Sequence, residues 1–293
     1  MNIISILRFI VRHPLNRKNK TKAVWRFIKW QINIRLNPYP IIYPFTDKAR
    51  LIVQKGMTGA TGNLYCGLHE FNDMAFLLHT LREKDYFVDI GANVGSYTIL
   101  ASAHAGAHTI SVEPLPSTFL HLVRNIAVNE IHEKVTAYNI ALGSEKDSLE
   151  FTSLYDTENH IANEGDHNTI KVPVETLDEL MIGKQIPVLL KIDVEGFETK
   201  VLQGSIETLQ QNGLKAIIIE LNGLGERYNF DENKIHNQLI ELNFRPFQYD
   251  PMERKLLSID TFGPFNTIYI RDLDFIRQRI KSAAKIRILD QEI

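Results

Sequence analysis

The feature that most limits how this chain can fold is an alternation of strand-like and helix-like patterns from residue 86 onward. Apolar runs suited to strands cover residues 86–90, 109–112, 135–140, 188–192, 216–219, 244–249 and 267–270, and helical patterns cover 96–105, 117–129, 197–212 and 231–243. Short runs that are apolar throughout are typical of parallel strands buried on both faces. We therefore expect an α/β protein whose ligands bind beyond the carboxyl ends of the strands.

The remainder of the chain divides around this alternating region. Of the 293 residues, 44% are hydrophobic and 23% are charged, which excludes a disordered chain. We expect a basic N-terminal arm over 1–46 and a cap over 47–84, with a hairpin at 51–67 and a helix at 71–81. The main domain is expected over 85–272 with an inserted hairpin at 148–175, and a C-terminal helix over 273–293.

The arm differs from the rest of the chain in charge. Residues 1–46 hold nine Lys or Arg and no Asp or Glu; since the whole chain carries −2, the other residues carry −11. Residues 22–30 suit an amphipathic helix, and the residues after them suit a strand as well. The arm either contacts an anionic membrane through residues 1–36 or packs over the main domain with its basic side in water. The acidic main domain would repel phosphates, so no nucleic-acid partner is expected.

The ends of the chain and its single cysteine bear on localisation. No run of roughly 20 apolar residues is present, and the apolar start is followed by basic residues, the reverse of a signal peptide. Cys66 alone excludes an internal disulfide and fits a reducing compartment. We expect a cytoplasmic protein, peripheral to the inner face of the membrane if the arm binds lipid.

A glycine-rich loop between the first strand and the next helix is the first candidate site. The segment Asp89-Ile-Gly-Ala-Asn-Val-Gly95 places Gly91 and Gly95 where the backbone must turn tightly. N–H groups at the helix start favour an anionic group. Asn93 stands where the dinucleotide fingerprint has its second glycine, and its side chain would crowd a pyrophosphate. The loop suits a ligand that bears an amino acid, with an NAD(P)-dependent oxidoreductase or sugar epimerase as the alternative.

Carboxylates follow two strands that neighbour this loop. Glu113 ends the second strand, 22 positions after Gly91, where it can accept hydrogen bonds from both hydroxyls of a ribose. Asp193 ends the 188–192 strand and is expected to overlook the same crevice, with Glu195 and Glu198 after it. Such a group is costly unless it serves protons, cations or hydrogen-bond donors. For Glu195 and Glu198, favourable charge at a helix N-terminus is the alternative.

In combination, these segments resemble the FkbM family of S-adenosylmethionine (SAM)-dependent methyltransferases. The matching segments are VDIGANVGSYT (88–98), VEPLPSTF (112–119), the turn 141–143, VETLD (174–178) and LKIDVEGFETKVLQG (190–204). The resemblance implies a class I SAM-dependent methyltransferase (Rossmann-like) fold, with a seven-stranded, mostly parallel sheet that contains one antiparallel strand. It also implies SAM above the carboxyl edge of this sheet and S-adenosylhomocysteine (SAH) as the product.

The resemblance assigns roles to individual positions. The loop 89–95 would hold the methionine part of SAM, Glu113 the ribose, the turn 139–141 the adenine, and Glu70 the amino group. The cofactor-binding residues it implies are Glu70, Asp89, Gly91, Asn93, Gly95, Glu113, Asn139 and Ala141. Asp193 would lie near the sulfonium and the acceptor.

The chemistry of methyl transfer indicates what else the site needs. The sulfonium is already activated, so the protein positions the reactants, and a base helps a hydroxyl acceptor lose its proton. Asp193 and His160 are the candidate catalytic residues; for His160, a solvated loop position is the alternative. The resemblance implies O-methylation of a sugar, glycan, glycolipid or related polar metabolite.

Two further alternatives remain open at this stage. No metal is expected, but in one variant a divalent cation is held by Asp193, Glu220 and Asn222 and activates a bound diol. In the other, the chain is a non-catalytic membrane-surface binding module on a methyltransferase fold.

Overall fold

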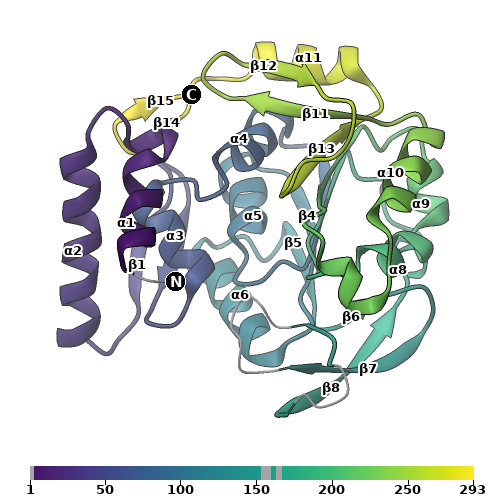
Figure 1. Ribbon diagram of the computed structural model, residues 1–293, viewed down its shortest axis with the longest axis horizontal. Helices are drawn as coiled ribbons and strands as arrows, with labels where there is room; N and C mark the ends of the chain where they lie inside the picture. The colour runs from purple at the N-terminus through teal and green to yellow at the C-terminus, as the bar shows by residue number, and fades with distance from the viewer. Residues whose placement is uncertain (1–2, 153–159, 163–166) are drawn as a thin grey trace.

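The fold is seen in a computed structural model that describes residues 3–152, 160–162 and 167–293. A central sheet has the strand order β12-β11-β13-β10-β9-β3-β4-β5 (Figure 1). The strands are β3 (Tyr86–Ile90), β4 (His108–Val112), β5 (Val135–Tyr138), β9 (Leu189–Ile192), β10 (Ala216–Glu220), β11 (Arg245–Asp250), β12 (Lys255–Ser258) and β13 (Asn266–Ile270).

The sheet has the direction pattern that was expected, with one strand more. Strands β5, β4, β3, β9 and β10 are parallel neighbours, and β13 inserts antiparallel between β10 and β11. The prediction of a mostly parallel α/β sheet is therefore confirmed. β12 adds an eighth strand, antiparallel to β11, at the edge.

Helices cover both faces of this sheet. One apolar core lies under α4 (Phe71–Thr80), α5 (Ser96–Ile99) with its π-helical continuation η2 (Leu100–His104), α6 (Pro116–Val128) and α11 (Leu273–Ser282). The second core lies under α7 (Leu177–Leu180), α8 (Glu198–Gln203), α9 (Ile206–Gln210) and α10 (Glu232–Glu241). The strands buried between these layers end at one edge, where the site lies.

The N-terminal arm is helical and packs on the first core. It consists of α1 (Ile3–Arg12), the short helix η1 (Pro14–Asn16) and α2 (Lys20–Leu36). Ile10, Phe27 and Trp30 are buried in the core shared with the main domain, which confirms that the arm packs. The strand alternative after residue 30 is wrong, because α2 continues without a break to Leu36.

The hairpin predicted over 51–67 is wrong. Strand β2 (Arg50–Val53) pairs antiparallel with the preceding strand β1 (Ile41–Pro44). The residues after β2 form helix α3 (Thr58–Cys66). The glycines suggested turns, but Gly62 lies inside the helix and serves close packing. A Cβ at Gly62 would lie 2.5 Å from Nδ1 of His69, so only glycine admits the histidine ring there.

Two of the predicted helices have other bounds in the structure. The helix expected over 197–212 is divided at Gly204 into α8 and α9, and a Cβ at Gly204 would lie 2.0 Å from the carbonyl oxygen of Gly143. The helix expected over 273–293 ends at Ser282. A hairpin of β14 (Arg287–Ile288) and β15 (Gln291–Glu292) follows, which buries Ile286, Ile288 and Ile293.

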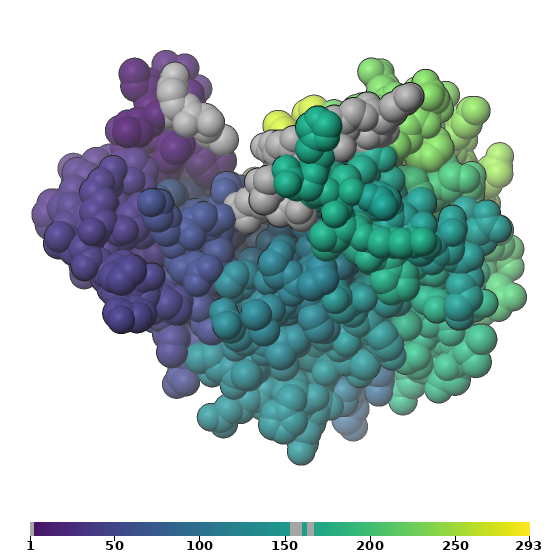
Figure 2. Space-filling model, turned by 90° about the horizontal axis from the view of Figure 1, so that it is seen from below, coloured from purple at the N-terminus to yellow at the C-terminus, as the bar shows by residue number. Residues whose placement is uncertain are grey.

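The insertion forms its own small sheet. Strand β7 (Asp147–Thr152) pairs antiparallel with β8 (Thr169–Glu175), as predicted, and β6 (Ala141–Leu142) joins the other side of β8. Figure 2 shows that the N-terminal helices and the β7–β8 hairpin project from the body on either side of a notch. Across the described ranges 3–152, 160–162 and 167–293, we find no helix with the length and apolar character needed to cross a membrane.

Candidate functional site

A cavity of about 270 Å³ lies at the carboxyl edge of the sheet. Its floor comes from the loop after β3 and from the ends of β4, β9 and β10, and its walls from α3 and from Phe151 of β7. This is the edge at which ligands of parallel sheets bind. We refer to this cavity as the crevice.

At Gly91, two segments of the crevice floor pack closely against each other. Its φ is +78°, and a Cβ there would lie 1.7 Å from the backbone oxygen of Asp193. Gly95 has a φ of +91°, and a Cβ there would lie 2.6 Å from Cδ1 of Leu122 on α6. Both positions thus require glycine, and the first brings the loop after β3 against the end of β9.

The backbone amides of this loop do not form the open cradle that the sequence indicated. The N–H of Asn93 donates to Oε2 of Glu113 at 2.9 Å, and that of Val94 donates to Oδ1 of Asn93 at 2.7 Å. The N–H groups of Gly91 and Ala92 both donate to the carbonyl of Val112. The amides of residues 91–93 therefore hold the loop on the end of β4.

Polar side chains supply what the loop amides do not. Nδ2 of Asn63, from α3, donates to Oγ of Ser96 at 3.0 Å, and both residues line the crevice. Because the Ser96 oxygen accepts this bond, its own hydrogen is available for a ligand. Oδ1 of Asn63 accepts from the N–H of His69 at 2.8 Å, which fixes the amide orientation.

Glu113 is 5% exposed at the end of β4. Burial raises its pKa to about 7, although the N–H groups of Leu115 and Asn93, which donate to its two oxygens, act in the opposite direction. Asn139 donates from Nδ2 to the carbonyls of Glu113 and Pro114 at 2.9 and 2.8 Å and so braces this segment. Of the two residues predicted to border the adenine, Ala141 lines the crevice, whereas Asn139 is not among the described residues that line it.

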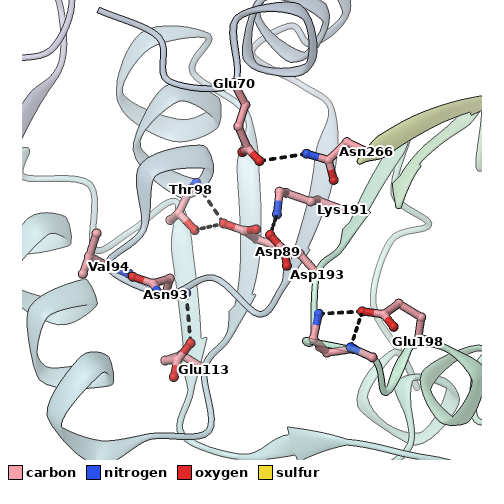
Figure 3. A network of polar contacts seen from close by, with 12 residues as sticks. Glu70, Asp89, Asn93, Val94, Thr98, Glu113, Lys191, Asp193, Glu198 and Asn266 are labelled. Atoms are coloured by element: carbon pink, nitrogen blue, oxygen red, sulfur yellow. Dashed lines mark hydrogen bonds and ion pairs between the residues drawn. The ribbon is translucent and has the colours of Figure 1, made fainter. Parts of the chain in front are cut away.

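Asp89 is buried at the end of β3, beside the crevice. Its Oδ2 accepts hydrogen bonds from the N–H and the hydroxyl of Thr98, at 3.0 and 2.6 Å (Figure 3). Burial raises its pKa, and the charge of Lys191 acts against that shift. Asp89 thus ties strand β3 to helix α5 from a position that lines the crevice.

Lys191 is a buried cation that the sequence analysis missed. Its ammonium lies 2.6 Å from Oδ2 of Asp193 (Figure 3). It also lies 4.6 Å from the ring centroid of Tyr97. Burial alone would lower its pKa, but the carboxylates of Asp193, Glu70 and Asp89 outweigh burial and hold that pKa above its usual value. A lysine within the otherwise apolar run Leu189–Ile192 was the available signal.

The far end of the crevice gathers carboxylates. Oxygens of Asp193, Glu195 and Glu220 lie within 4.8 Å of one another, and burial with the nearby charge of Asp193 raises the pKa of Glu220 to about 9. Glu70 also lines this end and accepts from Nδ2 of Asn266 at 2.9 Å (Figure 3). Asn222, the third member of the cation site considered from the sequence, is exposed and accepts from the N–H of Leu224 instead.

Glu198 behaves as a helix cap. It is 3% exposed, and its Oε1 accepts from the N–H groups of Val194 and Gly196 at 3.0 and 3.3 Å. Burial raises its pKa to about 7. The geometry favours the structural alternative that we gave for this residue.

His160 lies on the inserted hairpin. Its backbone N–H donates to the Thr152 hydroxyl at 3.0 Å, and its carbonyl accepts from the Thr152 N–H at 2.9 Å. Of the polar segment 156–163 that carries it, residues 156–159 and 163 lie outside the described residues. In the described part of the chain, His160 is not one of the residues lining the crevice, so its catalytic role stays a prediction.

Comparisons with known proteins agree with this arrangement. Residues 89–276 match the family described as methyltransferase FkbM domain. The hexuronic acid methyltransferase AglP of Haloferax volcanii is 28% identical over 153 residues, which cover 50% of this chain and 59% of that protein. Methyltransferase 1 of Beauveria bassiana is 29% identical over 160 residues, 46% of this chain and 64% of that protein.

Solved structures give a weaker likeness. The crystal structure of methyltransferase FkbM from Methylobacillus flagellatus has a TM-score of 0.44 and 14% identity, over 71% of this chain and 53% of that one. The matches to both curated relatives span about three fifths of their lengths. The family match covers well over half of the chain, and the chain therefore belongs to the FkbM methyltransferase domain family.

Proposed function

We propose that this protein transfers a methyl group from SAM to a hydroxyl of a sugar or related polar acceptor. The observation that carries the proposal is the polarity of a single crevice. A buried carboxylate suited to a ribose lies at one end, and a group of carboxylates suited to a cation lies at the other, around Lys191. SAM has this layout, with a ribose diol at one part and a sulfonium and an ammonium at another.

In this proposal the residues of the crevice divide the ligand between them. Glu113 keeps unused lone pairs on both oxygens after its two backbone contacts, because a carboxylate offers about four acceptor sites, and it accepts from the ribose hydroxyls. Ser96 donates to the ligand carboxylate, and Glu70 accepts from the amino group. Ala141 borders the adenine.

At the acceptor end, Asp193 takes the proton. SAM supplies a methyl group already activated on its sulfonium. As the acceptor oxygen bonds to the methyl carbon and the carbon–sulfur bond breaks, Asp193 accepts the hydroxyl proton and later releases it to water. Lys191 holds Asp193 in place, since the buried ion pair fixes the carboxylate 2.6 Å from the ammonium. SAH leaves as the product.

The proposal of a sugar acceptor is supported by a single relative. One relative is named as a hexuronic acid methyltransferase, and this favours a sugar acid or a glycan that contains one. The family match argues against the NAD(P)-dependent alternative. A non-catalytic module would bind SAH but would transfer no labelled methyl group to any acceptor fraction.

The test is methyl transfer from radiolabelled SAM to uronic acid glycosides, alongside calorimetry with SAH. We expect Glu113→Gln to weaken SAH binding about 10- to 100-fold, because a hydrogen bond to a charged acceptor contributes about 1.5–3 kcal/mol. The exposed Glu241→Gln is the matched control and should bind as the wild type does. Unchanged binding by Glu113→Gln would remove the main support of the proposal.

Binding of SAM should release protons. Burial, with the nearby charge of Asp193, raises the pKa of Glu220 to about 9, so this carboxyl is mostly protonated at neutral pH. A bound sulfonium favours the ionised carboxylate and lowers this pKa, so affinity for SAM should rise from pH 6 to pH 9.

Calorimetry in buffers of different ionisation enthalpy measures this release directly. SAH, which lacks the sulfonium charge, is the matched ligand and should release fewer protons than SAM. Equal proton release by SAM and SAH would contradict the assignment of the acidic end to the sulfonium.

A further inference from the structure

Helix α2 carries two apolar faces, and only one of them is covered. Ala23, Phe27 and Trp30 are buried against the body of the protein. The exposed apolar side chains are Trp25 (62%), Ile28 (39%), Ile32 (49%) and Leu36 (80%), which we call the outer stripe. At about 100° per residue, the outer stripe spans an arc of about 80° opposite the buried set.

The outer stripe faces away from the rest of the molecule. In Figure 1, α2 is the outermost element, and α1 lies between it and the body. A packed surface helix needs one apolar face. A continuous second apolar face, with residues spaced three and four apart, indicates a surface that binds a partner outside this chain.

The charges beside the outer stripe indicate what it receives. Lys29 lies on one margin and Arg35 on the other, both exposed, and residues 1–46 contain no acidic residue. Lys22 lies on the same side as Lys29, where it pairs with Asp290 at 2.7 Å. Arg26 is directed inward, to the carbonyl of Tyr65 at 2.9 Å, and so contributes to packing.

We infer that the outer stripe of α2 lies in the headgroup region of a membrane that contains anionic lipid. Trp25 and the aliphatic side chains would enter the boundary of the acyl chains, while Lys29 and Arg35 would reach the phosphates on either side. The rest of the chain carries −11, so an anionic surface attracts the arm and repels the body, which orients the protein. A second copy docked through the same face would bring these basic margins together, which disfavours a dimer.

The two tryptophans give the experiment an internal control. The protein has two tryptophans, Trp25 in the outer stripe and Trp30 at 4% exposure in the packed face. The full chain is mixed with vesicles of phosphatidylcholine alone or of phosphatidylcholine with phosphatidylserine. Only the anionic vesicles should shift the fluorescence to the blue and cosediment the protein, and Trp25→Phe should lose the spectral shift.

Two triple variants separate the outer stripe from general surface hydrophobicity. Trp25→Gln with Ile28→Gln and Ile32→Gln should weaken vesicle binding about tenfold or more. The control replaces the exposed Ile182, Ile206 and Leu257 of the body with Gln and should bind as the wild type does. Salt at about 1 M, where the Debye length is about 3 Å, should also weaken binding.

Several outcomes would overturn the inference. They are equal binding to both vesicle types, equal loss in both triple variants, or a dimer by light scattering that only the stripe variant dissociates. SAH calorimetry on the same samples should be unchanged, so failure here is distinguishable from failure of the proposed function.

Discussion

Replacing Gly91 with alanine is expected to abolish detectable SAH binding and to lower the melting temperature by about 5–10 °C. The new Cβ would meet the backbone oxygen of Asp193 at 1.7 Å, and no side-chain rotation relieves a contact with backbone. Overpacking costs about 1–3 kcal/mol, and a left-handed φ adds about 1 kcal/mol for a residue with a Cβ. The loop after β3 and the end of β9 must move apart, which opens the crevice floor. Calorimetry and thermal unfolding measure the two effects.

Gly183 provides the matched control for this substitution. Its φ is +72°, similar to that of Gly91, but a Cβ there would meet no atom of the described residues within 4 Å. Gly183→Ala should therefore show the cost of the backbone conformation alone, about 1 kcal/mol, with SAH affinity unchanged. If both alanine variants behave alike, the contact between Gly91 and Asp193 has no part in ligand binding.

Replacing Asp193 with asparagine is expected to lower kcat about 10²- to 10⁴-fold while SAH affinity changes little. The amide keeps the shape of the side chain but cannot take a proton from the acceptor hydroxyl, and positioned bases contribute about this much. Single-turnover transfer of labelled methyl, with SAH calorimetry on the same preparation, separates chemistry from binding. A variant that retains more than about a tenth of the wild-type rate would leave proton removal to another group.

The same substitution also removes the partner of a buried cation. Lys191 is 2% exposed, and removal of one member of a buried ion pair typically costs about 3–5 kcal/mol. The double variant Lys191→Met with Asp193→Asn should recover most of this stability and none of the rate. Comparing the four proteins of this cycle in unfolding and in turnover distinguishes loss of a base from loss of the fold.

Features carried by local sequence could be predicted. Apolar runs predicted strands β3 and β4, and glycines predicted the turn between β3 and α5. Strand ends predicted the positions of the carboxylates Glu113 and Asp193. Parallel pairing then brings these features to one edge of the sheet. The order of segments 88–98, 112–119 and 190–204 identified the family, which the family match confirms.

Features decided by contacts between distant residues could not be predicted. The glycines of α3 were interpreted as turn residues. The reason for Gly62 is its contact with the ring of His69, which the sequence alone does not reveal. Similarly, the amides of residues 91–93 donate to Val112 and Glu113 at the end of another strand, which no local pattern indicates. The ammonium of Lys191 also lies over the ring of Tyr97 on α5, a contact with a distant segment that the local sequence does not indicate.

The walls of the crevice have a different origin from its floor. The floor is the sheet itself, whereas Phe151 and helix α3 belong to segments attached around it. Grafting the β7–β8 hairpin from a relative would alter the entrance and leave every floor residue in place, whereas α3 must keep Asn63, which donates to Ser96. Acceptor preference could then drift in evolution, or be re-engineered in chimeras, without rebuilding the machinery that carries the methyl donor.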